Sequence, residues 1–107
     1  HNKKQEYFLC LYLDGANHLI QTKIITIGIL NQSLVHPREV FSNENKKRCA
    51  SIIVAHNHPS GILEASSEDI NVTKRLKESG KILGIELLDH LIITNDGFVS
   101  LKEEGVL

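Results

Sequence analysis

The segment from Ser51 to Ala55 constrains the fold of this chain more than any other part of the sequence. Its residues, SIIVA, are mainly β-branched and include no charged side chain. Continuous apolar runs of this kind are typical of a strand at the centre of a sheet, where both faces are buried. The segment therefore predicts a central strand that ends at His56, where a polar loop with the sequence HNHPSG begins.

Other apolar segments supply neighbours for this central strand. Residues 7–13 (YFLCLYL) are almost wholly apolar and end at the turn signal DGAN, which predicts a buried strand followed by a hairpin. Residues 20–29 are rich in Ile and Thr and should form the returning strand. Pro37 makes the segment 33–40 an edge strand at most. The apolar segment 87–94, the turn NDG and the segment 98–101 predict a second hairpin.

Two helices are expected between these strands. Ser42 is a natural N-cap for a polar helix at 43–50, and Ser66 or Ser67 should cap a second helix that runs to about Gly80. The predicted order is β-β-β-α-β-α-β-β. It describes one α/β domain in which a mixed β-sheet is sandwiched by helices.

Charge and cysteine content exclude several classes of protein. The chain of 107 residues has 12 basic and 13 acidic residues, a net charge of -1 and a pI near 6.6, so it lacks the basic footprint of a nucleic-acid binder. Cys10 and Cys49 lie in apolar or helical contexts and are expected to be buried free thiols in a reducing compartment. The sequence carries no signal-peptide pattern and no membrane span, so a cytoplasmic domain is expected.

The residues with the greatest chemical content are His56, His58 and Asp69. Residues i and i+2 of an extended strand point to the same side, so the two imidazoles should face one way. Asp69, eleven residues after His58 in the first turn of the next helix, can fold back as a third ligand. Two nitrogens and one oxygen with an open fourth position are the arrangement of catalytic zinc. The alternative is that Ser66 and Asp69 only cap the helix, which requires no metal.

These motifs resemble a known family. The pattern of His56, His58, Pro59, Ser66 and Asp69 is similar to the signature of the JAMM (MPN+) metalloproteases. The runs VHPREVF, AHNHPSG and LLDHLII further resemble the bacterial RadC family, whose JAMM-like domain follows a helix-hairpin-helix region. The resemblance covers essentially all of residues 1–107 and implies the JAMM/MPN (cytidine deaminase-like) architecture. It also implies a fragment of a longer protein, from which the helix-hairpin-helix region is absent.

The resemblance assigns roles residue by residue. It makes His56, His58 and Asp69 the zinc ligands, Ser66 the hydroxyl that assists the oxyanion, and Glu6 the general base. Glu39 is the competing candidate for the base, because it lies closer in sequence to the histidines. Two positions depart from the wider protease family, which usually has Ser or Thr between the histidines and Pro before the serine, where this chain has Asn57 and Ala65.

Two functions are compatible with these residues. The first is a zinc-dependent hydrolase that acts on a peptide or isopeptide bond of a peptide or protein substrate. The alternative is a non-catalytic metal-binding interaction module in a DNA-repair or mobile-element protein. A zinc nucleobase deaminase is excluded, because its thiolate ligands and His-x-Glu pattern are missing. Asp89 and His90 alternate on the predicted strand, so only one of them can face the metal. Asp89 could accept a hydrogen bond from a ligand imidazole, but burial with a local partner is the favoured interpretation.

Overall fold

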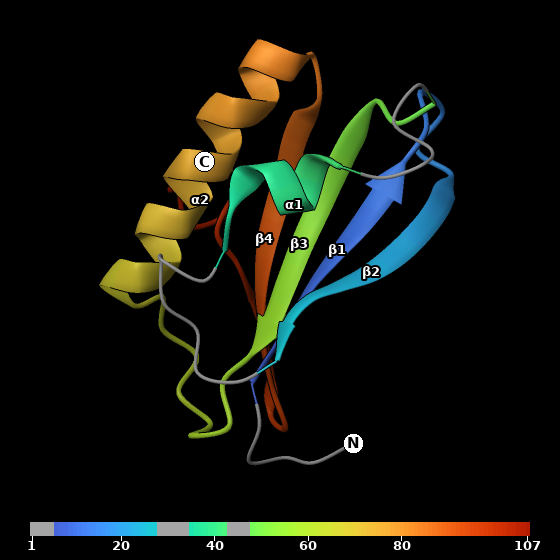
Figure 1. Ribbon diagram of the computed structural model, residues 1–107. Coiled ribbons are helices and arrows are strands. Elements are labelled where there is room, and N and C mark those ends of the chain that lie inside the picture. The colour runs from blue at the N-terminus through green and yellow to red at the C-terminus, as the bar shows by residue number, and fades with distance from the viewer. Residues whose placement is uncertain (1–5, 28–34, 43–47) are drawn as a thin grey trace.

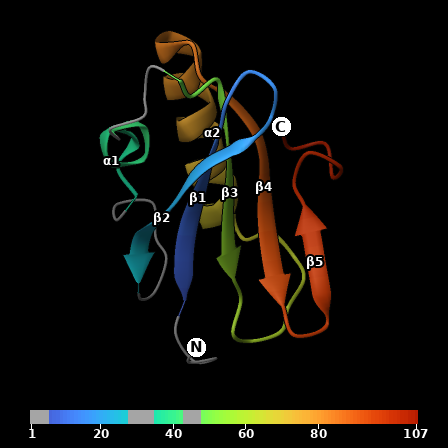
Figure 2. The same ribbon diagram turned by 90° about the vertical axis from the view of Figure 1, so that its right-hand side faces the viewer.

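A computed structural model describes residues 6–27, 35–42 and 48–107, and shows a five-stranded sheet with two helices (Figure 1). The strands are β1 (Tyr7–Leu13), β2 (Leu19–Ile27), β3 (Ser51–Asn57), β4 (Glu86–Thr94) and β5 (Gly97–Ser100), and the helices are α1 (Pro37–Phe41) and α2 (Ser67–Leu83). The strand order is β2-β1-β3-β4-β5, with β3 and β4 parallel and the other neighbours antiparallel. Figure 2 shows the strands side by side with α2 behind them. The predicted α/β class and mixed sheet are confirmed.

The first hairpin follows directly from its sequence. Phe8, Cys10 and Tyr12 alternate along β1 and are all buried on one face. The turn after β1 is held by Asp14, whose Oδ1 accepts hydrogen bonds from the backbone N–H groups of Ala16 and His18, each at 2.9 Å. The predicted bounds 7–13 are confirmed, and β2 starts one residue earlier than predicted. Residues 28–29 of the predicted second strand lie outside the described residues.

Both helices of the described part of the chain lie on the same face of the sheet, and the hydrophobic core fills the space between them. The Tyr12 hydroxyl of β1 donates a hydrogen bond to the carbonyl of Val40 in α1, which fixes that helix over the sheet. α2 contributes Val72 and Leu76 to the same core. Cys10 and Cys49 are buried and free, as predicted, and burial raises the pKa of the Cys10 thiol to about 12.

The segment between β2 and β3 differs from the prediction. Instead of an edge strand at 33–40, the described residues form the short helix α1, in which Pro37 occupies the first turn. Proline is favourable there because its missing N–H would have no helical partner in any case. Ser42 is the C-cap of α1. Of the predicted helix 43–50, residues 43–47 lie outside the described residues and 48–50 are not helical.

α2 is three residues longer than predicted, and two glycines explain why. Gly80 lies inside the helix, where an added Cβ would be 2.2 Å from the carbonyl oxygen of Ile85, so it permits a close approach of backbones. Gly84 ends the helix in the left-handed conformation with φ 74°, and the N–H of Ile85 then bonds to the Gly80 carbonyl at 2.8 Å. The stop signal is therefore Gly84.

No helix in the described ranges is long and apolar enough to cross a membrane.

Candidate metal centre

The predicted ligands meet where β3 ends and α2 begins. His56 is the second-last residue of β3, His58 follows the strand, and Asp69 lies in the first turn of α2. The connection between them is the loop that carries HPSG. In sheets with parallel strands, this carboxyl edge is the usual place for a site, because the following helix starts there and its N-terminus points toward the edge.

The three side chains approach one another closely. Their candidate ligand atoms all lie within 4.8 Å of one another. His56 Nε2 is 2.9 Å from Asp69 Oδ1, and His58 Nε2 is 3.2 Å from Asp69 Oδ2. The side chains of His56 and Asp69 are almost fully buried, whereas 13% of the His58 side chain is exposed. Ligand atoms of a tetrahedral zinc site with bonds of 2.0–2.1 Å would lie about 3.3 Å apart, and the two His–Asp distances are close to this value.

The backbone sets the tautomer of His58. Its Nδ1 lies 2.9 Å from the carbonyl oxygen of Ile62. A carbonyl oxygen can only accept, so Nδ1 carries the proton, and the neutral ring then has its lone pair on Nε2. That lone pair belongs to the atom nearest Asp69, as a metal ligand requires.

The surroundings of His56 indicate a cation site more strongly than those of His58. Its Nε2 is buried and is not hydrogen-bonded within the described structure, although a carboxylate oxygen lies beside it. A lone pair and a carboxylate oxygen at this distance repel each other unless a proton or a metal ion lies between them. Two imidazole nitrogens and one carboxylate oxygen are also the donor set that zinc accepts. The residues present therefore fit a divalent metal ion.

Asp69 supports this fit as an anion. Burial by itself would raise the pKa of its carboxyl group, but His56 and the hydrogen bond from the Ser66 N–H outweigh that effect and hold the pKa well below its usual range. Ser66 and Asp69 also form a capping box: Asp69 Oδ2 accepts the Ser66 N–H at 2.7 Å, and Ser66 Oγ accepts the Asp69 N–H at 3.1 Å. The capping alternative and the metal hypothesis are thus compatible, because Oδ1 remains directed at His56.

His90, and not Asp89, contacts a ligand imidazole. His90 Nε2 lies 2.9 Å from His56 Nδ1, and His90 Nδ1 lies 2.6 Å from Thr73 Oγ1. Burial lowers the pKa of His90 to about 3, so its ring is neutral. Asp89 faces the other side of the sheet, where it accepts hydrogen bonds from Ser100 and from the backbone of Lys102. Asp89 thus has local partners, as the favoured interpretation predicted, and the alternative bond to a ligand imidazole is wrong.

Thr73 is a residue that sequence reasoning missed. It follows Asp69 by four positions in a helix, so the two residues share a face of α2, and that spacing was a usable signal. The pairing with His90 was not visible in the sequence, because it depends on β4 lying beside β3. His90 is the direct partner of Val54 in that parallel register.

An open cavity of about 280 Å³ lies over the cluster. Glu6 and Ser66 line it together with the three candidate ligands, and its remaining described lining residues are Ser60, Ile62, Glu64 and Glu68. Glu6 reaches it because β1 runs antiparallel beside β3, with Phe8 opposite His56. Glu39 does not line this cavity; it is exposed on α1.

The start of β1 is tied to the histidine segment by a side chain. The backbone N–H of Tyr7, the residue after Glu6, donates a hydrogen bond to Asn57 Oδ1 at 2.6 Å. Asn57 is the residue between the two histidines, and it is one of the positions that depart from the wider protease pattern. In this fold it connects the strand that carries His56 to the strand that follows the candidate base.

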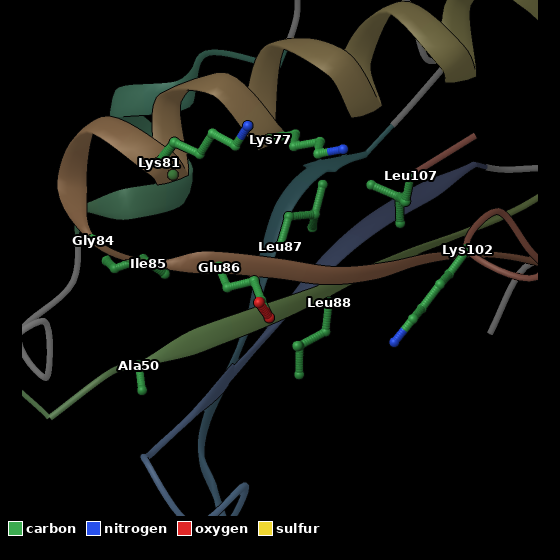
Figure 3. Close-up of a pocket in the computed structure, with 11 residues that line it drawn as sticks. Ala50, Lys77, Lys81, Gly84, Ile85, Glu86, Leu87, Leu88, Lys102 and Leu107 are labelled. Atoms are coloured by element: carbon green, nitrogen blue, oxygen red, sulfur yellow. The ribbon is translucent and has the colours of Figure 1, made fainter. Parts of the chain in front are cut away.

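A larger cavity of about 460 Å³ lies away from the cluster, beside the end of α2 and the start of β4. Figure 3 shows three lysines at its walls, but Lys102 extends on the opposite side from Lys77 and Lys81, so their amino groups do not converge. None of the candidate ligands lines this cavity. The chemistry of the described residues is therefore concentrated at the smaller cavity.

Comparisons with known proteins agree with this geometry. The RadC-like JAB domain family matches residues 1–106. A UPF0758 protein of Bacillus licheniformis is 57% identical over 103 residues, covering 96% of this chain and 46% of the relative. Similar proteins from Geobacillus sp. (60% over 101 residues) and Bacillus cereus (58% over 102 residues) cover 94% and 95% of this chain, and each is covered to 45% of its own length. The chain thus spans about half the length of these curated relatives. It belongs to the RadC-like JAB domain family.

Proposed function

We propose that this domain is a zinc-dependent hydrolase of the JAMM type that acts on a peptide or isopeptide bond. The observation that carries the proposal is the buried His56 Nε2, which makes no hydrogen bond in the described structure although Asp69 Oδ1 lies 2.9 Å away. His56, His58 and Asp69 would hold the metal ion, and the cavity beside them would admit the substrate. When bound, zinc would polarise a carbonyl oxygen and lower the pKa of a water molecule to near 7.

The chain's own residues would carry the proton transfers. Glu6 lines the same cavity as the three ligands, so its carboxylate can take a proton from the attacking water and deliver it to the leaving amine. Ser66 also lines the cavity, and its hydroxyl accepts the Asp69 N–H, which leaves the hydroxyl proton available for a developing oxyanion. One such donor contributes about 3 kcal/mol to transition-state stabilisation in other hydrolases.

The charge of the cavity favours an amide over a phosphodiester substrate. Glu6, Glu64, Glu68 and Asp69 line it, and its described lining residues include no lysine or arginine. A polyanion such as nucleic acid requires basic residues at the contact surface. The cavity therefore suits a neutral or cationic peptide segment, which supports the hydrolase proposal against a function on the DNA backbone.

Elemental analysis tests the metal. The chain purified without added metal or chelator should contain about one zinc ion per molecule, as expected for one site with three protein ligands. The double variant His56→Ala, His58→Ala should contain almost none, and Glu39→Gln serves as a control that keeps all three ligands. Equal and low zinc in the wild type and the double variant would contradict the metal assignment.

Hydrolysis assays test the base. The zinc-loaded chain should cleave members of a quenched fluorescent peptide library or a lysine isopeptide conjugate, and Glu6→Gln should reduce the rate about 100-fold or more because the general base is lost. Glu39→Gln is the matched control and should retain both the rate and the metal. If the fully loaded wild type cleaves neither substrate, the hydrolase proposal is wrong and the non-catalytic metal-binding module replaces it.

A further inference from the structure

We propose that Thr73 and His90 are positioning residues that hold His56 in the tautomer whose Nε2 can bind the metal. The inference rests on the metal site of the proposed function, but it does not depend on hydrolysis. It is carried by three consecutive hydrogen bonds that run from the backbone of α2, through Thr73 and His90, to the ligand imidazole. The direction of each bond follows from the one before it.

The first bond fixes the hydroxyl of Thr73. Thr73 Oγ1 donates to the carbonyl oxygen of Asp69 at 2.7 Å, one turn earlier in α2. A hydroxyl has a single proton, so Oγ1 can only accept at its second contact, with His90 Nδ1 at 2.6 Å. His90 must therefore carry its proton on Nδ1.

The second step transfers this constraint to the ligand. His90 is fully buried, and a neutral imidazole has one N–H. With the proton on Nδ1, His90 Nε2 is an acceptor, and its partner at 2.9 Å is His56 Nδ1. His56 Nδ1 must therefore donate, which leaves the lone pair of the neutral ring on Nε2, the atom that faces Asp69 Oδ1.

If donor and acceptor were exchanged in the hydrogen bonds between Thr73, His90 and His56, a proton would block the metal site. If Thr73 donated to His90 instead, His90 would carry its proton on Nε2 and donate to His56 Nδ1. The proton of His56 would then lie on Nε2, at the position that a metal would occupy. The bond from Thr73 to the Asp69 carbonyl selects the direction that leaves His56 Nε2 free to bind the metal. Asp69 therefore has two roles: its carboxylate lies beside His56 Nε2, and its carbonyl oxygen accepts the Thr73 hydroxyl proton.

Packing keeps both rings in place for this arrangement. Phe8 of β1 stacks on His56 with ring centroids 6.0 Å apart and meets His90 edge to face at 5.7 Å. A ring flip of either histidine would exchange a nitrogen for a carbon in the hydrogen-bonded chain. The aromatic contact therefore supports the ring orientation, while Thr73 determines which nitrogen carries the proton.

Two measurements test the proposal. The first is a long-range ¹H–¹⁵N correlation spectrum of the metal-free wild-type chain at about pH 8, above the ordinary imidazole pKa of about 6.5. We expect the Nδ1–H tautomer for His90, because the Thr73 bonds fix it whether a proton or a metal ion lies between His56 Nε2 and Asp69 Oδ1. An Nε2–H tautomer at His90 would overturn the proposal, and this result needs no variant to fold.

The second measurement is zinc affinity by competition with a chromophoric chelator. Thr73→Val removes the acceptor of His90 at nearly constant volume and should weaken zinc binding roughly 10- to 100-fold, the range found when partners of metal ligands are removed. Thr73→Ser keeps the hydroxyl and should bind zinc within about threefold of the wild type. If the hydroxyl had a purely structural role, a folded Thr73→Val chain would bind zinc as well as the wild type. Circular dichroism confirms that each variant is folded. Wild-type affinity in a folded Thr73→Val chain would overturn the proposal.

These outcomes separate the inference from the proposed function. A chain that binds zinc with the expected tautomers, and loses affinity on Thr73→Val, supports the positioning role even if it cleaves no amide. A chain that hydrolyses amides with zinc, yet shows the Nε2–H tautomer at His90 when metal-free, refutes the positioning role and leaves the hydrolase proposal standing.

Discussion

The two ends of the β3-α2-β4 unit contrast in how they are built. The metal end contains His56, His58, Ser66 and Asp69, and its buried atoms are nitrogens and oxygens that contact one another. The glycine end contains Ala50, Gly80, Gly84 and Ile85, and there two backbones approach so closely that a Cβ at Gly80 would overlap the Ile85 carbonyl. The larger cavity lies at the glycine end and the candidate chemistry at the metal end.

In this domain the larger of these two cavities is not the one that the candidate metal ligands line. The glycine end is packed for stability, and its polar backbone atoms bond to each other. The metal end keeps a buried nitrogen without a hydrogen-bond partner in the described structure, which costs stability unless a cation binds. We therefore expect substitutions at the glycine end to change folding, and changes at the metal end to act mainly through metal binding.

The largest expected effect on stability is at the glycine end. Gly80→Ala would place a methyl group 2.2 Å from a backbone oxygen that cannot move without shifting the start of β4. We expect the free energy of unfolding to fall by about 3 kcal/mol, measured by urea denaturation. The control is Gly15→Ala, which has open space around its Cβ and should change stability by less than about 0.5 kcal/mol. If Gly80→Ala left the free energy of unfolding unchanged, the proposed contrast between the two ends would be wrong.

Metal removal should have a smaller effect, confined to the metal end. A ligand that binds only the folded state at a hundredfold excess over its dissociation constant stabilises by about 2.7 kcal/mol. Chelation should therefore lower the melting temperature and leave the circular dichroism spectrum folded at room temperature, because the core between the sheet and the helices contains no metal ligand. A random-coil spectrum after chelation would show that the metal end also determines the fold.

The smallest expected effect concerns the helix end itself. Gly84→Ala keeps open space around the new Cβ but forces a non-glycine residue into φ 74°. The left-handed conformation costs about 1 kcal/mol, which thermal unfolding can resolve, and zinc affinity should remain at the wild-type value. A loss of zinc affinity in this variant would mean that the glycine end and the metal end are coupled through α2.

The sequence predicted the regular elements where local patterns agree with the fold. The apolar runs in β1 and β3 and the turn signal NDG are local signals, and all three elements were found, although the turn is 95–96 because Gly97 already belongs to β5. Helix α1 was missed because five residues contain too little periodicity, and Pro37 suits an edge strand as well as a first helical turn. Burial of Val40 and Phe41 against the core, which no local pattern reveals, favours the helix.

The candidate site divides in the same way. His56, His58 and Asp69 lie within 14 residues of sequence, so their meeting could be anticipated from strand and helix geometry. His90 could not be placed, because it is 34 residues from His56 and meets it only through the parallel pairing of β3 and β4. The roles of Glu6 and Ser66 stay predictions, supported by their positions in the cavity.

The hydrogen bond between Tyr7 and Asn57 links the segment of the candidate base to the segment of the histidines. Glu6 belongs to the segment that enters β1, and the histidines belong to the segment that leaves β3. The bond opposes sliding of one segment along the other, so it helps to keep the carboxylate and the imidazoles at a constant separation. The distance from base to ligands is thereby set by strand pairing, and a one-residue slip in that pairing would turn Glu6 to the opposite face of the sheet.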